Sequence, residues 1–299
     1  MYWSSNEGLR LDMIANAMPV NRFEEIRRYL HFADNYSHEP GNKDKLFKIQ
    51  PVLDRLEASF SKAVDPEEFQ SVDEQMISFK GHLSIKQYIP KKPKPWGLKV
   101  WVRAGTSSSP YIPKKPKPWG LKVWVRAGTS RYMYRFEVYQ GTSGGMGEAS
   151  TLGMCADVVL LLCDDIQNKN HKVFFDNLFC TIALLQRLRD QGIYATEHHL
   201  PSLALLLDIV KELERLRTAV KLYNKNMGGV DLIDQCVSMY PHRRKNRRWY
   251  IRVFFHFLDV TCVNAWLLYR MAGFYDQDLL NFKASIAQSL INAGSLEQR

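Results

Sequence analysis

The sequence contains little cysteine and no long apolar run. Its five cysteines lie far apart and none forms a Cys-x-x-Cys pair, which excludes a cysteine-pair zinc or redox motif within it. The first twelve residues, MYWSSNEGLRLD, are polar, unlike a secretory leader. The longest apolar stretch, Ala156–Cys163, is much shorter than a membrane span. We therefore expect a soluble intracellular protein with buried thiols and no membrane partner.

Acidic residues are outnumbered by basic ones, and part of this imbalance comes from an internal repeat. The 31 acidic residues face 41 lysines and arginines, giving a formal net charge of +10 that favours a polyanionic partner. The segment YIPKKPKPWGLKVWVRAGTS occurs twice, at Tyr88–Ser107 and Tyr111–Ser130. Each copy contains five basic residues and no acid, so one copy accounts for half of the net charge. Net charge alone therefore does not establish nucleic-acid binding.

The spacing of apolar residues changes from helical to strand-like near residue 69. Asn21–Phe32 and Val52–Ala63 have the periodicity of amphipathic helices. The predicted order that follows is strand (72–79), strand (97–105 or its repeat), strand (132–140), helix (152–164), strand (171–179), helix (181–190) and strand (192–196). Long helices are expected at 231–240 and 249–271. This order is typical of an α/β protein with a mixed sheet flanked by helices.

The same pattern divides the chain into four expected parts. Residues 1–68 form a helical N-terminal region. Residues 69–196 form the first part of an α/β domain, which contains the repeat 88–107/111–130. Residues 197–218, EHHLPSLALLLDIVKELERLRT, form a leucine-rich segment of different character. Residues 219–299 complete the α/β domain and add the C-terminal helices.

Acidic residues occupy positions where side chains of an α/β fold can converge. Asp73 lies within the first predicted strand, Asp176 directly follows the apolar strand VFF, and Asp231 follows Gly-Gly at a helix start. Asp234 lies one helical turn later. Carboxylates are ligands for hard divalent cations, and two such ions about 3.5–4 Å apart can promote phosphoryl transfer. Each acid alone could be a helix cap, so the prediction is that Asp73, Asp176 and Asp231 lie together, with Asp234 at the edge.

A dense basic segment precedes the last long apolar helix. Residues 242–252 have the sequence HRRKNRRWYIR, with cations at Arg243, Arg244, Lys245, Arg247 and Arg248. These side chains suit phosphate contacts, and the adjacent Trp249 and Tyr250 offer stacking surfaces. The alternative is a solvated helix terminus, but cations at a helix N-terminus oppose the helix dipole. We therefore predict that His242–Arg248, the basic segment, binds DNA; its composition is also that of a nuclear localisation signal.

These stretches together resemble the piggyBac transposase family. The matching motifs are NRFEEIRRYLHFAD, SVDEQMISFKG, the repeated block, VFFDNLFC, and KLYNKNMGGVDLIDQ followed by the basic segment and VTCVNAWLLY. The resemblance implies a ribonuclease H-like domain with three aspartates that hold two Mg²⁺ ions. It also implies cutting at TTAA sites and direct transesterification, with water and then a DNA 3′-hydroxyl as nucleophiles. By motif, Asp73, Asp176 and Asp231 take the three aspartate positions, and Asp234 is a further metal-binding acid.

Other features depart from the family pattern. After GIYAT the family has a Gly-Thr-x-Arg strand and an insertion domain, whereas this chain continues with residues 197–218. The family's C-terminal zinc module has no counterpart in this sequence. The second copy of the repeat adds 23 residues between two strand partners. Either copy can supply the strand. We expect the second copy to do so and the first to be poorly ordered, because a short turn to the next strand costs less entropy.

Three functional interpretations follow. The intact aspartates favour an active Mg²⁺-dependent transposase that cuts and joins DNA at TTAA sites. The missing insertion domain, the missing zinc module and the interrupted hairpin favour a transposase-derived nuclear DNA-binding protein whose activity is lost or impaired. A third interpretation is a gene-model or pseudogene product without function. We favour the second, with DNA as the partner and Mg²⁺ as the cofactor where the site is intact; whether the chain forms a homodimer is open.

Overall fold

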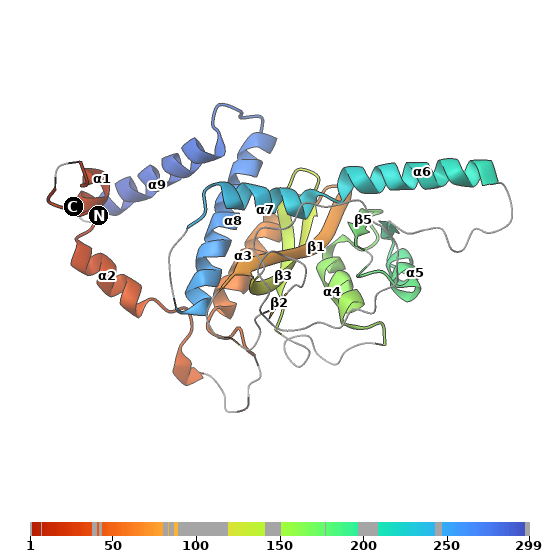
Figure 1. The fold of residues 1–299 in the computed structure, drawn as a ribbon, viewed down its shortest axis with the longest axis horizontal. Helices are drawn as coiled ribbons and strands as arrows, with labels where there is room; N and C mark the ends of the chain where they lie inside the picture. The colour runs from red at the N-terminus through yellow and green to blue at the C-terminus, as the bar shows by residue number, and fades with distance from the viewer. Residues whose placement is uncertain are drawn as a thin grey trace.

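A mixed β-sheet with helices on both faces forms the centre of the protein (Figure 1). The computed structural model describes residues 2–6, 8–37, 41, 44–79, 83, 87–88, 119–140, 151–176, 178–196, 209–242 and 247–296. Within them, the sheet contains β1 (Phe69–Ser78), β2 (Gln87–Tyr88), β3 (Trp119–Gly128), β4 (Met133–Val138), β5 (Lys172–Phe175) and β6 (Tyr194–Thr196). The order is β2-β3-β1-β5-β6, and β4 also pairs with β3. β1, β3 and β4 pair antiparallel, whereas β5 and β6 run parallel to β1.

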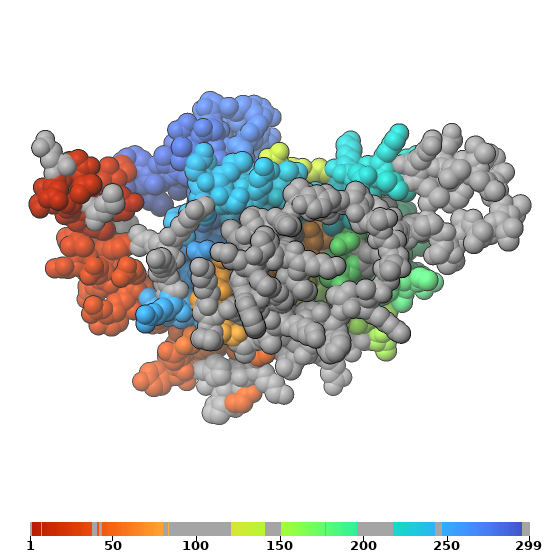
Figure 2. Space-filling view, viewed as in Figure 1, coloured from red at the N-terminus to blue at the C-terminus, as the bar shows by residue number. Residues whose placement is uncertain are grey.

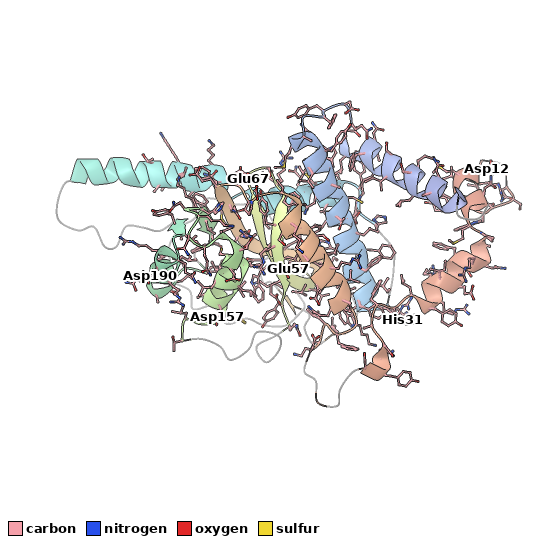
Figure 3. The ribbon with its side chains drawn as sticks, turned by 180° about the vertical axis from the view of Figure 1, so that it is seen from behind. Asp12, His31, Glu57, Glu67, Asp157 and Asp190 are labelled. Carbon is pink, nitrogen blue, oxygen red and sulfur yellow. The ribbon has the colours of Figure 1, made fainter. Side chains whose placement is uncertain are left out.

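Helices cover both faces of this sheet and extend from it at both ends of the chain. The described helices are α1 (Asp12–Ala17), α2 (Val20–Tyr29), α3 (Gln50–Ala63), α4 (Met154–Leu162), α5 (Ile182–Asp190), α6 (Ile209–Asn226), α7 (Gly229–Met239), α8 (Trp249–Met271) and α9 (Leu279–Leu296). One core lies between the sheet and α3, α7 and α8. A second core lies between the sheet and α4 and α5. Figure 3 shows α3 beside α8, with Glu57 of α3 close to the strands.

The sequence of β3 explains why the sheet has a core on each face. Val123 and Val125 belong to the first core, whereas Trp124 between them belongs to the second. Side chains alternate across a strand, so a strand that is apolar on both sides needs cover on both sides. The predicted α/β class and its mixed sheet are therefore confirmed, as are helices before and after it.

The second copy of the repeat supplies the central strand β3. Its residues 120–128 pair with Gln70–Ser78 of β1, and Val123–Ala127 pair with β4. The prediction that the second copy enters the sheet is confirmed. The first copy lies outside the described residues except for Tyr88, which pairs with Trp119 in β2–β3. The prediction of poor order in the first copy therefore stays a prediction.

Some helices differ from their predicted extents. The last helix predicted by residue range ends at residue 271, whereas the structure has a further 18-residue helix, α9, which contacts α1. The red N-terminal and blue C-terminal parts consequently lie together at one end of the molecule (Figures 1 and 2). Helix α6 crosses the expected boundary at residue 218 without a break. Residues 197–208 lie outside the described residues.

Helix α8 is apolar because it is a core helix. Among the described helices it is the one that is long and apolar enough to cross a membrane by length and composition. Half of its most apolar window is buried inside the structure, where Val253, Phe257 and Val260 have no exposed surface. Arg252 on the same helix donates from Nε to the carbonyl oxygen of Ser78 at 3.1 Å. The length and composition of α8 are thus explained by its packing.

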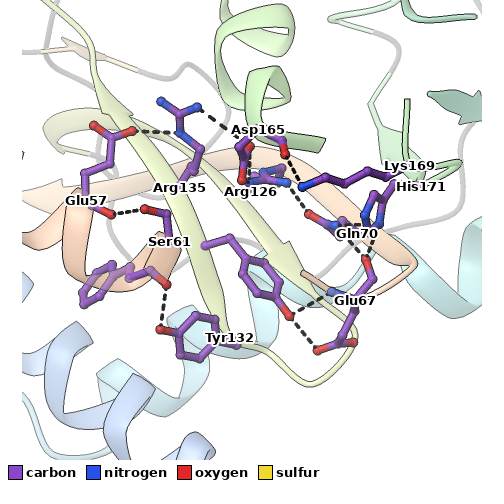
Figure 4. A network of polar contacts seen from close by, with 12 residues as sticks. Glu57, Ser61, Glu67, Gln70, Arg126, Tyr132, Arg135, Asp165, Lys169 and His171 are labelled. Carbon is purple, nitrogen blue, oxygen red and sulfur yellow. Dashed lines mark hydrogen bonds and ion pairs between the residues drawn. The ribbon is translucent and has the colours of Figure 1, made fainter. Parts of the chain in front are cut away.

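A buried arginine in the second copy of the repeat forms an ion pair with the half-buried Asp165 in the turn after α4 (Figure 4). The Arg126 side chain is fully buried and donates to Gln70 Oε1 at 2.7 Å and to Asp165 at 2.6 and 2.7 Å. Arg135, opposite it on β4, donates to Glu57 at 3.0 Å and lies 3.8 Å from Asp165. Two cations placed opposite each other on paired strands would repel. The two carboxylates offset this repulsion and connect α3, β3, β4 and the turn after α4.

We predict that the two copies of the repeat differ in their contribution to stability. Trp124→Ala in the second copy should lower the free energy of unfolding by about 3–5 kcal/mol, because it empties a fully buried position. The equivalent Trp101→Ala in the first copy should change it by less than about 0.5 kcal/mol. Urea unfolding of both variants measures this. Equal losses would contradict the assignment of the second copy to β3.

Four acidic residues line a cavity of about 430 Å³ between α3 and β4. They are Asp44, Asp54, Glu57 and Glu137. Burial raises the pKa of Glu137 to about 7, and the neighbouring charges of Glu57, Asp54 and Asp44 add to this, while Arg135 opposes it. The ionised form of Glu137 is therefore disfavoured in the folded protein.

This raised pKa predicts a loss of stability between about pH 4.5 and pH 7. The folded protein binds the Glu137 proton more tightly than the unfolded chain does, so stability falls as pH rises through this window. Glu137→Gln should remove this decline and stabilise the protein at pH 8 on the order of 1–2 kcal/mol, after allowance for solvent screening. Thermal unfolding from pH 4 to 8 measures it, with Glu24→Gln on the exposed surface of α2 as the matched control. A wild-type profile identical to that of Glu137→Gln would refute this.

Candidate functional site

Asp73 and Asp176 come from neighbouring parallel strands. Val72 of β1 is registered with Phe175 of β5, and the next residues along the two chains are Asp73 and Asp176. Val72 and Phe175 both face the second core. The following residue of β1 therefore faces the opposite side, where α7 lies. Asp73 is half-buried and Asp176 is exposed. The register thus brings these two predicted site residues to the same place in the sheet, which we call the acid edge.

Helix α7 packs against β1 and β3 and carries the other two acids, Asp231 and Asp234. A Cβ atom on Gly229 would lie 2.7 Å from the carbonyl oxygen of Gly128 and 2.7 Å from Ser71 Oγ. Only glycine lets the helix start this close to β1 and β3. Asp234, further along α7, contacts Gln75, further along β1. The exposed Asp231 lies in the sequence of α7 between Gly229 and Asp234. Asp73 likewise lies in β1 between Ser71 and Gln75, which these two residues contact.

The contact at Asp234 is part of a longer polar chain. Gln75 Nε2 donates to Asp234 Oδ1 at 2.7 Å, and His256 Nε2 of α8 donates to Gln75 Oε1 at 2.9 Å. Gln75 is fully buried, whereas Asp234 and His256 are half-buried. Three elements, β1, α7 and α8, are therefore joined through one glutamine.

The acids suit a divalent cation in donor type. Carboxylate oxygens are the ligands that Mg²⁺ prefers. Within the described ranges, no group of three His, Cys, Asp or Glu side chains lies close enough together to hold a metal ion. Each of the four aspartates 73, 176, 231 and 234 has an interaction partner in the structure. That they hold metal together stays a prediction, based on the register that brings Asp73 and Asp176 together and on the chemistry of carboxylates.

The basic segment is described in part. Arg243, Arg244 and Lys245 lie outside the described residues, whereas Arg247 is exposed. The Arg248 guanidinium donates to the carbonyl oxygens of Arg28 and Leu30 at 3.1 and 3.2 Å, and also to that of Arg27. These carbonyl groups lie at the C-terminal end of α2, where backbone acceptors lack helical partners. Arg248 therefore attaches α2 to α8, a role that its sequence context did not reveal.

A buried carboxylate anchors the start of the basic segment. Asp259 of α8 is 3% exposed and accepts hydrogen bonds from the His242 backbone N–H and Nδ1, both at 2.8 Å. Lys283 of α9 donates to it at 2.6 Å. Burial would raise the Asp259 pKa, but the hydrogen bonds from His242 and Lys283 outweigh it and lower the pKa. The ionised Asp259 therefore holds His242 against α8 at neutral pH.

Arg252 connects the basic segment with the strand of the acid edge. Its guanidinium donates to the carbonyl oxygen of Ser78 at the end of β1 and to that of His242, at 3.1 and 3.3 Å. Ser78 lies five residues beyond Asp73. At about 3.3 Å per residue, this is roughly 16 Å along the strand. Arg252 thus connects the start of the basic segment to the end of the strand that carries Asp73.

Some functional candidates were not predicted from the sequence. Gln75, His256 and Asp259 interrupt apolar patterns in β1 and α8, and this interruption is the signal that could have revealed them. A polar residue in an otherwise buried pattern costs free energy unless it is paired. All three are paired.

The strand order and directions define the class of protein as a ribonuclease H-like α/β domain. The chain belongs to a transposase family: the family model described as Transposase IS4 matches residues 1–109, 102–197 and 210–266. The first two matches overlap at residues 102–109, where the first copy of the repeat ends. The stretch between the second and third matches is residues 198–209.

Relatives with curated names are piggyBac-derived proteins, as the motifs predicted. PiggyBac transposable element-derived protein 2 of Homo sapiens is 27% identical, over 96% of this chain and 55% of the relative. PiggyBac transposable element-derived protein 3 of Homo sapiens is 24% identical, over 96% of this chain and 54% of the relative. The chain thus spans about half the length of these relatives. The first alignment covers 349 positions, so it exceeds the 299 residues of this chain by at least 50 positions.

The fold also matches a solved structure, the cryo-EM structure of the piggyBac transposase synaptic complex with hairpin DNA. The TM-score is 0.75 at 18% identity, over 98% of this chain and 66% of that chain. This likeness confirms the fold predicted from the family resemblance.

Proposed function

We propose that this chain is a transposase-derived DNA-binding protein of the nucleus whose strand-cleavage and joining activity is lost or impaired. The observation that carries the proposal is the link made by Arg252 between the basic segment and the strand of Asp73. The link supports the proposal because it connects the start of the basic segment, to which we assign phosphate binding, with the strand of Asp73. Among the described residues, no three His, Cys, Asp or Glu side chains lie close enough together to hold a metal ion.

DNA binding is supported by the positive charge of the basic segment and by the attachment of its first residue to α8. The basic segment starts at His242, which Asp259 and Arg252 hold against α8. A tethered cationic segment loses less conformational freedom on binding phosphates than a loose one. The matched piggyBac transposase is a complex with hairpin DNA. Nuclear localisation is proposed on the composition of the same segment.

Impaired activity is supported by internal differences between this sequence and its relatives. Relatives align over more positions than the chain has residues, so they contain internal segments without a counterpart here. The repeat adds a further connection between β1 and β3. Two-metal chemistry requires ligands held within about 0.5 Å of their productive positions. A shortened and interrupted domain meets that requirement less readily.

The alternative is an active metal-dependent transposase that cuts and joins DNA at TTAA sites, and the β1–β5 register favours it. Asp73 and Asp176 follow registered residues of parallel strands, and α7, which carries Asp231 and Asp234, packs against β1. These four side chains would hold the divalent ions. When bound, Mg²⁺ would supply Lewis-acid stabilisation of the phosphate oxygens.

Light scattering of the purified chain decides whether it is a monomer or a homodimer.

We expect salt-sensitive DNA binding with little sequence preference. If about five phosphates are contacted, the logarithm of affinity should fall against the logarithm of salt concentration with a slope near −4 to −5. Replacing Arg243, Arg244 and Arg247 by Ala should flatten this slope by about three. Arg248 is left intact because it holds α2. Fluorescence anisotropy with TTAA-containing and scrambled duplexes measures this.

The matched control replaces Arg22, Arg187 and Arg189 by Ala, which removes the same charge from α2 and α5. Its slope should stay close to the wild-type value. An equal flattening in both triple variants would show that net charge, rather than the basic segment, binds the DNA.

We expect little or no Mg²⁺-dependent cleavage of a TTAA-containing duplex, because the acids are not gathered and the domain is shortened. Gel analysis of labelled duplex measures strand cleavage, with Asp176→Ala as the comparison. This variant should bind DNA as tightly as the wild type, or slightly more tightly through lost repulsion of phosphate. Cleavage by the wild type that disappears in Asp176→Ala would establish the active alternative.

A further inference from the structure

The C-terminal end of α2 carries two exposed arginines and is bound by a third arginine from a distant part of the chain. Arg27 and Arg28 lie in the last turn of α2. Arg248, at the start of α8, donates to the backbone carbonyl oxygens of both residues. Figure 3 shows His31, two residues beyond α2, at the N-terminal end of α8. The exposed Arg247 directly precedes Arg248. The end of α2 therefore lies one arginine side chain away from the basic segment.

The helix dipole explains only part of this arrangement. Cations in the last turn of a helix are favourable, and α5 has the same feature in Arg187 and Arg189. At the end of α2, two further cations come from distant elements. The Lys48 Nζ lies 5.8 Å from the centre of the Tyr250 ring, and the Arg248 guanidinium lies at the same distance from that ring. Positive charge from three separate segments is thus gathered around one tyrosine.

Much of this positive charge is not neutralised within the described part of the chain. None of the ion pairs between described residues involves Arg27, Arg28, Lys48 or Arg247. Like charges that lie close together repel, and an anionic partner relieves that repulsion. The surface therefore suits a polyanion such as the phosphate backbone of DNA.

We propose that Arg27 and Arg28 form a second phosphate-contact surface for duplex DNA, and that Arg248 is a positioning residue that holds this surface against the basic segment. The inference rests on the DNA binding of the proposed function. Arginine binds phosphate through two parallel hydrogen bonds. Because Arg248 already fixes α2 to α8, DNA can contact both surfaces without the entropic cost of bringing them together.

The test measures the affinity of the full chain for a TTAA-containing duplex against salt concentration, by fluorescence anisotropy. The double variant Arg27→Gln/Arg28→Gln keeps helix propensity and removes two charges. Each phosphate contact contributes about 0.9 to the slope, so the slope should flatten by about two. Affinity should fall about 10–100-fold at about 0.1 M salt. A scrambled duplex should give the same change, because phosphate contacts carry no sequence information.

Arg187→Gln/Arg189→Gln is the matched control. These arginines are also exposed in the last turn of a helix, so the control removes the same charge and the same interaction with the helix dipole. Helix α5 packs in the second core, whereas α8 packs in the first core on the other face of the sheet. The slope of the control should therefore stay close to the wild-type value. Thermal unfolding of every variant shows that affinities are compared on folded protein.

Arg248→Lys tests the positioning role. It keeps the charge but loses the fork of donors that spans the carbonyl groups of α2. The slope should flatten by about two although no charge has been removed, because the α2 surface is no longer held in place. Adding Arg27→Gln and Arg28→Gln to this variant should then change affinity less than about threefold. Losses that simply add would overturn the positioning role, since the three arginines would then act independently.

The outcomes separate this inference from the DNA binding on which it rests. A slope that is flattened by replacing Arg243, Arg244 and Arg247 but unchanged in Arg27→Gln/Arg28→Gln would overturn the second surface and leave the proposed function standing. Equal flattening in the α5 control would also overturn the second surface, since net charge would then suffice. A wild-type chain that binds no duplex would overturn the proposed function and this inference together.

Discussion

The pairing of β1 on both of its edges is the constraint on which the rest of the structure depends. One edge pairs antiparallel with β3 and the other parallel with β5. A slip of one residue on either side would move Asp73 and Gln75 to the face of the second core, because side chains alternate along a strand. The same register places Asp176 beside Asp73. It also lets Gly229 at the start of α7 approach the backbone of Gly128 and the side chain of Ser71 closely. The acid edge is a consequence of strand register rather than of any local motif.

Buried charge maintains this arrangement at two points. Arg126 and Asp165 connect the sheet to the turn after α4, and Asp259 connects the basic segment to α8 and α9. Burying an ion pair is costly unless its hydrogen bonds are satisfied, so such pairs specify geometry more than they add stability. Arg126 has an identical counterpart, Arg103, in the first copy. The ion pair therefore does not distinguish the copies. Their connections do: four residues join β3 to β4, whereas the first copy would need a much longer return.

Periodicity predicted the order β1, β3, β4, α4, β5, α5 and β6 correctly, because buried faces impose a period of two or 3.6 on the local sequence. It did not predict α9, whose weak pattern becomes helical where it meets α1. It also did not predict the role of Arg248. In the sequence that residue is one of several clustered cations, and the carbonyl groups it binds lie more than 200 residues earlier in the chain. A local pattern carries no information on partners so distant.

The sequence by itself determined the α/β class, the family motifs and the identity of the acids and cations, because each is encoded in residue type and spacing. Only the tertiary structure decided which arginine of the basic segment holds a helix, and that Gln75 joins His256 to Asp234. The physical reason is that these choices depend on strand register, connection length and hydrogen-bond partners from distant segments. Such partners meet only when the chain has folded.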